Sequence, residues 1–157
     1  MKNVATVERK SDHELVITRL INGPARLVFE AWTKAEVFEQ WWVPKSSGMS
    51  LVSCAMDVRV GGTYRLVFRH PAAPEPMAFY GRYLEVTPNA RLVWTNEESG
   101  DAGQVSTLTF AEMANQTQIT LHELYPSKEA LDEAIASGAQ PLESCDQLEE
   151  LMMARSA

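Results

Sequence analysis

From residue 49 to residue 124, apolar and polar side chains alternate with a period of two, which is the pattern of β-strands that bury one face. The clearest run covers residues 63–70, where Tyr64, Phe68 and His70 share one face. Glycine, proline and asparagine residues separate this run from its neighbours, as expected for short turns. The β-branched residues of 14–22, which end at an Asn-Gly turn signal, predict a first strand. The alternation predicts the strands that follow, at 49–58, 63–70, 77–86, 91–97, 104–113 and 116–124.

Two short helices are predicted between the first of these strands and the second. Pro24 suits the first position of a helix, because the backbone N–H that it lacks would have no partner there. Apolar residues then recur at helical spacing as far as residue 33. A second stripe, which includes Trp41 and Trp42, predicts a short helix over 34–42 that Pro44 ends.

The C-terminal region returns to helical spacing after Ser127, which we predict to be an N-cap. Gly138 and Pro141 interrupt the pattern, so the sequence predicts one long C-terminal helix with a kink. Residues 1–13 are polar and mixed, and we predict a flexible tail there. Residues 14–157 are then predicted to form a single domain, which suits the length of the chain.

Consecutive strands with short connections predict an antiparallel meander and exclude a series of βαβ units. A twisted antiparallel sheet must bury one face, and the C-terminal helix is the element long enough to cover it. The predicted fold class is therefore α+β, with a curved sheet of about six or seven strands around that helix. A curved sheet that grips one helix leaves space between the two layers, where a small apolar ligand could bind.

Charge and composition limit the classes of binding partner that the protein can have. The formal net charge is −7 and the isoelectric point is near 5.0, which argues against nucleic acids and anionic membrane surfaces. The sequence has no apolar stretch long enough to span a membrane and no apolar core of a signal peptide near residue 1. The two cysteines exclude a disulfide scaffold. We therefore expect a cytoplasmic protein.

Several motifs in a fixed order resemble one family. They are Val28-Phe29-Glu30-Ala31-Trp32, Trp41-Trp42 followed by Pro44, Asp57-x-Arg59-x-Gly61-Gly62-x-Tyr64, Gly81-x-Tyr83-Leu84-Glu85-Val86, Arg91-Leu92-Val93-Trp94-Thr95 and Thr120-Leu121-His122. The chain resembles the START-like, Bet v 1-type (SRPBCC) superfamily from about residue 14 to residue 153. Within it, the chain is most similar to homologues of the C-terminal domain of the heat-shock-protein-90 ATPase activator. This resemblance implies a helix-grip fold, whose members include ligand carriers, cyclases, hydrolases and co-chaperone modules.

Aromatic residues supply most of the candidate ligand-binding positions. Trp41 and Trp42 point about 100° apart on a helix, so we expect one in the core and one at a cavity mouth. If 81–86 and 91–97 pair as a hairpin, then Tyr83, Glu85, Trp94 and Asn96 share one sheet face. The full candidate set is Trp41, Trp42, Tyr64, Phe68, His70, Tyr83, Glu85, Trp94, His122, Leu148 and Met152.

Three functions stay open at this point. The first is a binding protein for a small hydrophobic or amphipathic molecule, without covalent chemistry or a cofactor. The second is a cyclase- or hydrolase-like enzyme that would use His122, Glu85 or Tyr83 as its acid or base. The third, implied by the resemblance, is a chaperone partner. Histidines and cysteines are too scattered to predict a metal site, and the sequence leaves open a homodimer.

Overall fold

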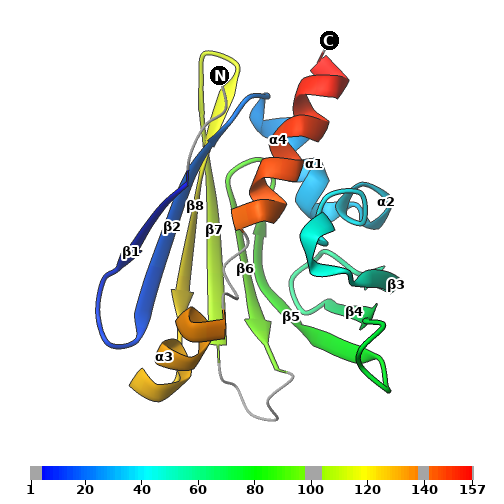
Figure 1. Ribbon diagram of the computed structural model, residues 1–157. Helices are drawn as coiled ribbons and strands as arrows, with labels where there is room; N and C mark the ends of the chain where they lie inside the picture. The colour runs from blue at the N-terminus through cyan, green and yellow to red at the C-terminus, as the bar shows by residue number, and fades with distance from the viewer. Residues whose placement is uncertain (1–4, 98–103, 138–141, 157) are drawn as a thin grey trace.

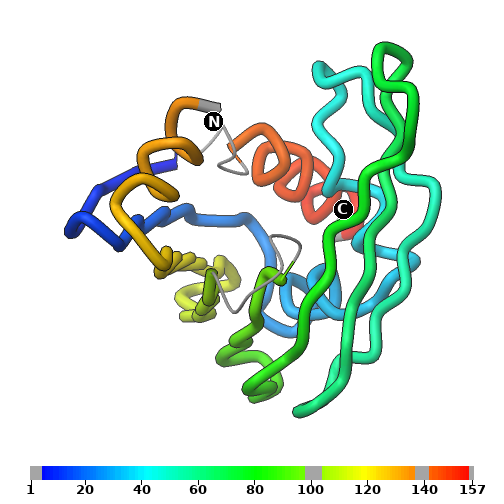
Figure 2. Tube along the Cα trace, turned by 90° about the horizontal axis from the view of Figure 1, so that it is seen from below, coloured from blue at the N-terminus to red at the C-terminus, as the bar shows by residue number. Residues whose placement is uncertain are grey.

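The computed structural model describes residues 5–97, 104–137 and 142–156. It has two layers, a curved antiparallel sheet and a set of helices that lie across its concave side (Figure 1). Seen from below, the sheet bends around the C-terminal helix (Figure 2). The predicted α+β helix-grip class is therefore confirmed. Within the described residues, no helix has both the length and the apolar character needed to cross a membrane.

The described strands form one eight-stranded sheet in the order β1-β2-β8-β7-β6-β5-β4-β3. Every neighbouring pair is antiparallel, as the short turns predicted. The bounds are β1 Thr6–Arg9, β2 Glu14–Ile21, β3 Ser50–Met56, β4 Thr63–Arg69, β5 Met77–Thr87, β6 Arg91–Asn96, β7 Gln104–Met113 and β8 Gln116–Leu124.

The sheet has one strand more than the sequence predicted, because β1 lies in the segment that we expected to be a flexible tail. Its register pairs Thr6 with Thr18 and Arg9 with Leu15. All four of its side chains are exposed, so β1 is held by backbone pairing and carries no alternating apolar pattern. A strand of this kind leaves no hydrophobic signal in the sequence.

The helices are α1 Ala25–Thr33, α2 Ala35–Phe38, α3 Lys128–Ser137 and α4 Leu142–Ser156, with a 3₁₀ turn, η1, at Lys45–Ser47. Pro24 precedes α1 in an extended conformation, and Ser127 accepts a hydrogen bond from the backbone N–H of Ala130 at 3.1 Å. The second helix is shorter than predicted. The predicted C-terminal helix is two helices, and the interruptions at Gly138 and Pro141 lie outside the described residues.

One register shift changes which side chains face the concave side. Tyr83 pairs with Trp94, but Glu85 pairs with Val93, so β5 carries a β-bulge between these pairs. Tyr83 faces inward and is 4% exposed, whereas alternation resumes after the bulge with Val86 opposite Leu92. The bulge therefore turns Glu85 away from the face that Tyr83 occupies.

Candidate functional site

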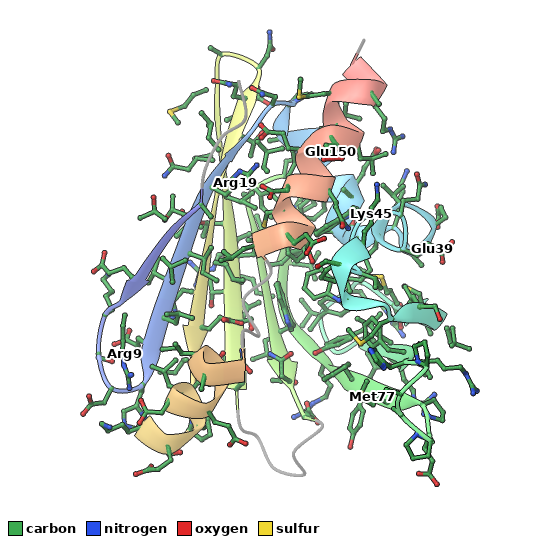
Figure 3. The ribbon with its side chains drawn as sticks, in the orientation of Figure 1. Arg9, Arg19, Glu39, Lys45, Met77 and Glu150 are labelled. Atoms are coloured by element: carbon green, nitrogen blue, oxygen red, sulfur yellow. The ribbon has the colours of Figure 1, made fainter. Side chains whose placement is uncertain are left out.

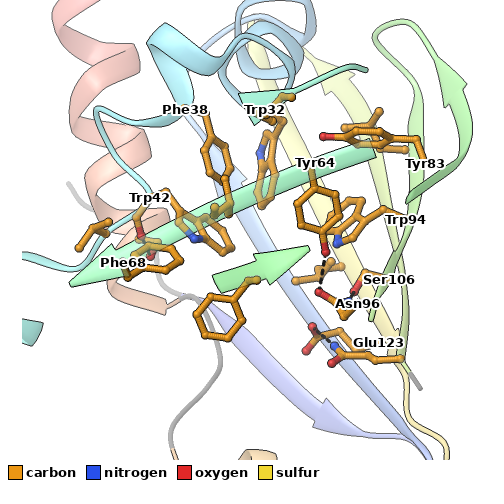
Figure 4. A pocket seen from close by; sticks show the side chains of 18 of the residues that line it. Trp32, Phe38, Trp42, Tyr64, Phe68, Tyr83, Trp94, Asn96, Ser106 and Glu123 are labelled. Atoms are coloured by element: carbon orange, nitrogen blue, oxygen red, sulfur yellow. Dashed lines mark hydrogen bonds between the residues drawn. The ribbon is translucent and has the colours of Figure 1, made fainter. Parts of the chain in front are cut away.

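A cavity of about 370 Å³ lies between the concave face of the sheet and the segment that runs from α1 to η1. The sequence predicted this space between the sheet and the C-terminal helix, but among the described side chains of α4 only Ser144, near its start, lines the cavity. Figure 4 shows 18 of the lining side chains. The lining comprises Trp32, Phe38, Trp42, Val43, Pro44, Met49, Met56, Tyr64, Leu66, Phe68, Phe79, Tyr83, Leu92, Trp94, Asn96, Gln104, Ser106, Leu121, Glu123, Tyr125 and Ser144.

One wall of the cavity is aromatic. The rings of Phe38 and Trp42 stack with centroids 4.9 Å apart, and the ring of Trp32 lies 5.7 Å from that of Trp42. Across the cavity lining, the Trp32 ring reaches the ring of Trp94 on β6 at 6.0 Å. Contacts between aromatic rings at these separations are favourable and hold each ring in place. The wall is therefore a rigid apolar surface.

The segment behind this wall is fixed by α4. The side-chain amide of Gln147 donates to the backbone oxygens of Trp41 and Val43 at 2.7 and 2.8 Å. Its oxygen accepts from the backbone N–H of Lys45 at 2.8 Å. The hydroxyl of Ser144 donates to the backbone oxygen of Trp42 at 2.5 Å. One turn of α4 thus satisfies the backbone of a segment that has no strand or long helix of its own.

The floor of the cavity follows cross-strand rows of the sheet. In one row, Leu92 on β6 and Leu121 on β8 line the cavity, and both pair with the fully buried Leu108 of β7. In the next row, Trp94 pairs with Ser106, and Ser106 pairs with Glu123. Side chains in one row point to the same face. The floor therefore changes from aliphatic to polar within one step of two residues along the strands.

The polar end of the cavity is a hydrogen-bonded cluster (Figure 4). The hydroxyl of Tyr64 lies 2.7 Å from the backbone oxygen of Thr95 and 3.1 Å from Oδ1 of Asn96. The Asn96 amide donates to Oγ of Ser106 at 3.1 Å. The Gln104 amide donates to Oε2 of Glu123 at 2.7 Å. These contacts hold the polar side chains in defined positions around the Glu123 carboxyl group.

Burial governs the chemistry of Glu123. Removal from water raises the pKa of its carboxyl group to about 7, although hydrogen bonds from Tyr125 and Gln104 favour the carboxylate. The Tyr125 hydroxyl is 3.3 Å from Oε1 of Glu123. Burial also raises the pKa of the Tyr83 and Tyr125 hydroxyls. Near neutral pH the described lining therefore includes one carboxyl group that can be charged or neutral, beside neutral phenols.

Five of the predicted ligand-binding residues line the cavity, namely Trp42, Tyr64, Phe68, Tyr83 and Trp94. Trp41 instead packs in the core, where its indole N–H donates to the backbone oxygen of Ala31 at 3.0 Å. The adjacent tryptophans therefore lie in different places, Trp41 in the core and Trp42 on the cavity lining. Leu148 and Met152 of α4 are fully buried in the hydrophobic core and lie outside the cavity lining.

The structure corrects the placement of the three predicted polar candidates. His122 pairs with Val16 and faces the side of the sheet away from the cavity, where its Nε2 lies 2.8 Å from Oε1 of Glu14. The β-bulge places Glu85 beside Arg91, at 3.3 Å. His70 follows β4, and its Nδ1 accepts from the backbone N–H of Ala72 at 3.0 Å. The acid or base candidates of the enzyme hypothesis were His122, Glu85 and Tyr83, and of these only Tyr83 lines the cavity.

Sequence reasoning missed four polar residues of the lining, namely Gln104 and Ser106 on β7, Glu123 on β8, and Tyr125 directly after β8. The signal for Glu123 was present, because Ile119 and Leu121 are apolar and a residue two positions further shares their face. The alternation along β7 gives Ser106 in the same way, through Leu108 and Phe110. No pattern within one strand could show that these two side chains lie opposite each other.

In the described part of the chain, no three His, Cys, Asp or Glu side chains are grouped as metal ligands.

Comparisons with known proteins agree with this architecture. The family model described as Activator of Hsp90 ATPase homolog 1-like protein matches residues 22–152. No curated protein matches the chain.

Three solved structures illustrate the similarity of fold. A Rhodobacter sphaeroides protein is 20% identical with a TM-score of 0.83, over 96% of this chain and 98% of that one. A Nitrosomonas europaea protein is 24% identical with a TM-score of 0.81, over 94% of this chain and 99% of that one. The AHSA1-like protein from Aeromonas hydrophila is 17% identical with a TM-score of 0.70, over 87% of this chain and 92% of that one.

Proposed function

The chain belongs to the family of Activator of Hsp90 ATPase homolog 1-like proteins, which has the SRPBCC type of fold, and from this premise we propose that it binds a small, largely apolar molecule. The ligand is held in the cavity between the sheet and the α1–η1 segment, without covalent chemistry. The observation that carries this proposal is the cavity of about 370 Å³ with its aromatic wall. Ligand sites are typically concave and apolar, with a few placed polar groups.

The lining favours binding over catalysis. Among the lining residues that the structure describes, Glu123 is the one carboxylate, and none is a histidine, cysteine or lysine. The phenols beside it stay protonated and are weak acids near neutral pH, because burial raises the pKa of Tyr83 and Tyr125. Glu123 has a pKa of about 7, which would suit a general acid or base, but among the described lining residues no second group of similar pKa lies beside it to act as its partner.

The test is saturable binding of a neutral apolar probe, N-phenyl-1-naphthylamine, followed by its fluorescence. We expect binding at a single site, together with a thermal shift by some members of a panel of lipids, polyketides and aromatic metabolites. Leu66→Trp adds volume on the cavity lining of β4 and should weaken probe binding at least about tenfold. Leu84→Trp is the matched control, because Leu84 is 47% exposed on neighbouring β5.

Urea unfolding of both variants would establish that each is folded. Indifference to the probe and to the whole panel would overturn the proposal, as would equal probe binding by the two variants.

Family membership is also compatible in a general way with a chaperone partner. Leu66→Trp separates the two roles, because a surface interaction that alters a chaperone's ATPase rate should survive filling of the cavity.

A further inference from the structure

The position of Ser106 defines a gap between an aromatic ring and a carboxyl group. Ser106 on β7 lies opposite Trp94 on one side and Glu123 on the other. Adjacent strands are about 4.8 Å apart, so the Trp94 and Glu123 backbones are separated by roughly 10 Å. The serine side chain between them is short, and all three residues line the cavity. A ligand above Ser106 can therefore contact the ring and the carboxyl group together.

The charge around this gap favours a ligand that donates hydrogen bonds over one that accepts them, because the charged group of the described lining is a carboxylate. No arginine, lysine or histidine is present among the described residues of the lining, so an anionic ligand would meet no opposite charge there. A carboxylate can accept about four hydrogen bonds, and from the described residues Glu123 accepts two, from Gln104 and Tyr125. The remaining acceptor sites, in an aromatic surrounding, suit a cation, because aromatic faces also attract positive charge.

We propose that the ligand is a basic alkylamine, primary or secondary and protonated near neutral pH, that carries an aryl or alkyl body; its ammonium group binds Glu123 while its body lies against Trp94 and the aromatic wall. This inference rests on the proposed binding function and specifies the ligand class. An ammonium–carboxylate contact is a charge-assisted hydrogen bond, which is stronger than a neutral one. The amine also offsets the cost of a buried carboxylate, which is the reason the pKa of Glu123 lies near 7 in the unliganded protein.

Few other ionisable groups face Glu123. Tyr125 follows β8 and donates to its carboxyl group, and Tyr64 reaches the same polar cluster from β4. His122 lies on the opposite side of β8, paired with Glu14, and favours the carboxylate at longer range. The facing positions on β6 and β7 are Asn96, Gln104 and Ser106, which do not titrate. A change in amine affinity near neutral pH therefore reports mainly on Glu123.

The experiment compares three ligands of the same shape by calorimetry: 2-(1-naphthyl)ethylamine, 2-(1-naphthyl)ethanol and 1-naphthylacetate. At about pH 8 we expect the amine to bind at least about tenfold more tightly than the alcohol, and the carboxylate to bind most weakly. Lowering the pH to about 6 should weaken amine binding about tenfold, because Glu123 becomes protonated, and should leave alcohol binding unchanged.

Glu123→Gln keeps the size of the side chain and removes its charge, so it should erase both the preference for the amine and its pH dependence. Glu85→Gln, which changes a carboxyl group outside the cavity lining, is the matched control and should retain both. Equal binding of amine and alcohol would overturn this inference and leave the proposed function standing. A preference for the amine that survives in Glu123→Gln would also overturn it. Failure of all three ligands and of the neutral probe would overturn both.

Discussion

Arg19 on β2 and Glu149 on α4 form a buried ion pair, with Nη2 of the arginine 2.8 Å from Oε1 of the glutamate. Their side chains are 1% and 2% exposed. Asp146 contacts the same guanidinium at 2.6 Å, and Oε2 of Glu149 accepts from the backbone N–H of Asn22 at 3.0 Å. Figure 3 shows Arg19 on the side of β2 nearest α4. Although burial opposes it, the hydrogen bonds that Arg19 donates to Glu149 and Asp146 raise the pKa of its guanidinium group, so this group is charged and its contacts fix the helix to the sheet.

Removal of one partner of this pair should be costly. We expect Glu149→Ala to lower the free energy of unfolding by about 3 kcal/mol, because the buried guanidinium loses its most buried partner. Urea denaturation measures the change. Glu150→Ala, at the exposed position next along α4, is the matched control and should change stability by less than about 0.5 kcal/mol. Similar values for the two variants would contradict a structural role for the pair.

Loss of the hydrogen bonds from the Gln147 side chain should destabilise the segment that carries the aromatic wall. Gln147→Leu leaves the backbone oxygens of Trp41 and Val43 without their donor, so we expect a loss of about 2 kcal/mol in the free energy of unfolding. Binding of N-phenyl-1-naphthylamine should weaken as well, because Trp42 and Val43 line the cavity. Gln40→Leu removes a single exposed bond to the backbone of Glu36 and should affect neither measurement.

The raised pKa of Glu123 predicts an unusual dependence of stability on pH. A carboxyl group whose pKa rises from 4.5 to about 7 on folding contributes stability that is fully present below its unfolded pKa and is lost as the pH rises through about 7. Glu123→Gln cannot ionise, so this variant should gain stability relative to the unchanged protein between about pH 5 and pH 8. Chemical denaturation across that interval measures the difference. Parallel stability curves for the two proteins would refute this assignment.

The turn between β7 and β8 offers a stabilising substitution. Ala114 has a backbone φ of 51° and Asn115 one of 68°, so both central residues adopt the left-handed conformation of a two-residue hairpin turn. An alanine is strained there, and we expect Ala114→Gly to raise the free energy of unfolding by about 1 kcal/mol. Ala111→Gly, inside β7, should lower it by a similar amount. The melting temperatures of the two variants should move in opposite directions.

Local periodicity was sufficient for most of the fold. Six strands could be placed from alternation after residue 49, and the strand at 14–22 from its β-branched residues. The antiparallel order from β3 to β8 followed from short turns that join consecutive strands, whereas the pairing of β2 with β8 came only from the tertiary structure. The strand β1 could not be placed, because its exposed side chains bury no face. The length of the helix predicted over 34–42 was too great, because contacts with a distant helix decide where it ends. Trp41 and Trp42 follow Val37 and Phe38 at helical spacing. However, hydrogen bonds from α4 hold the backbone after Phe38 in another conformation.

For the site, the sequence by itself determined an aromatic concave face, since Tyr64, Phe68, Tyr83 and Trp94 follow from alternation within single strands. Only the tertiary structure decided its chemistry. The bulge in β5 turned Glu85 outward, and cross-strand register placed Glu123 two strands from Trp94, with Ser106 between them. Alternation is a property of one strand, which the chain encodes locally. Register and burial depend on which distant strands pair, and it is burial that sets the charge state of Glu123.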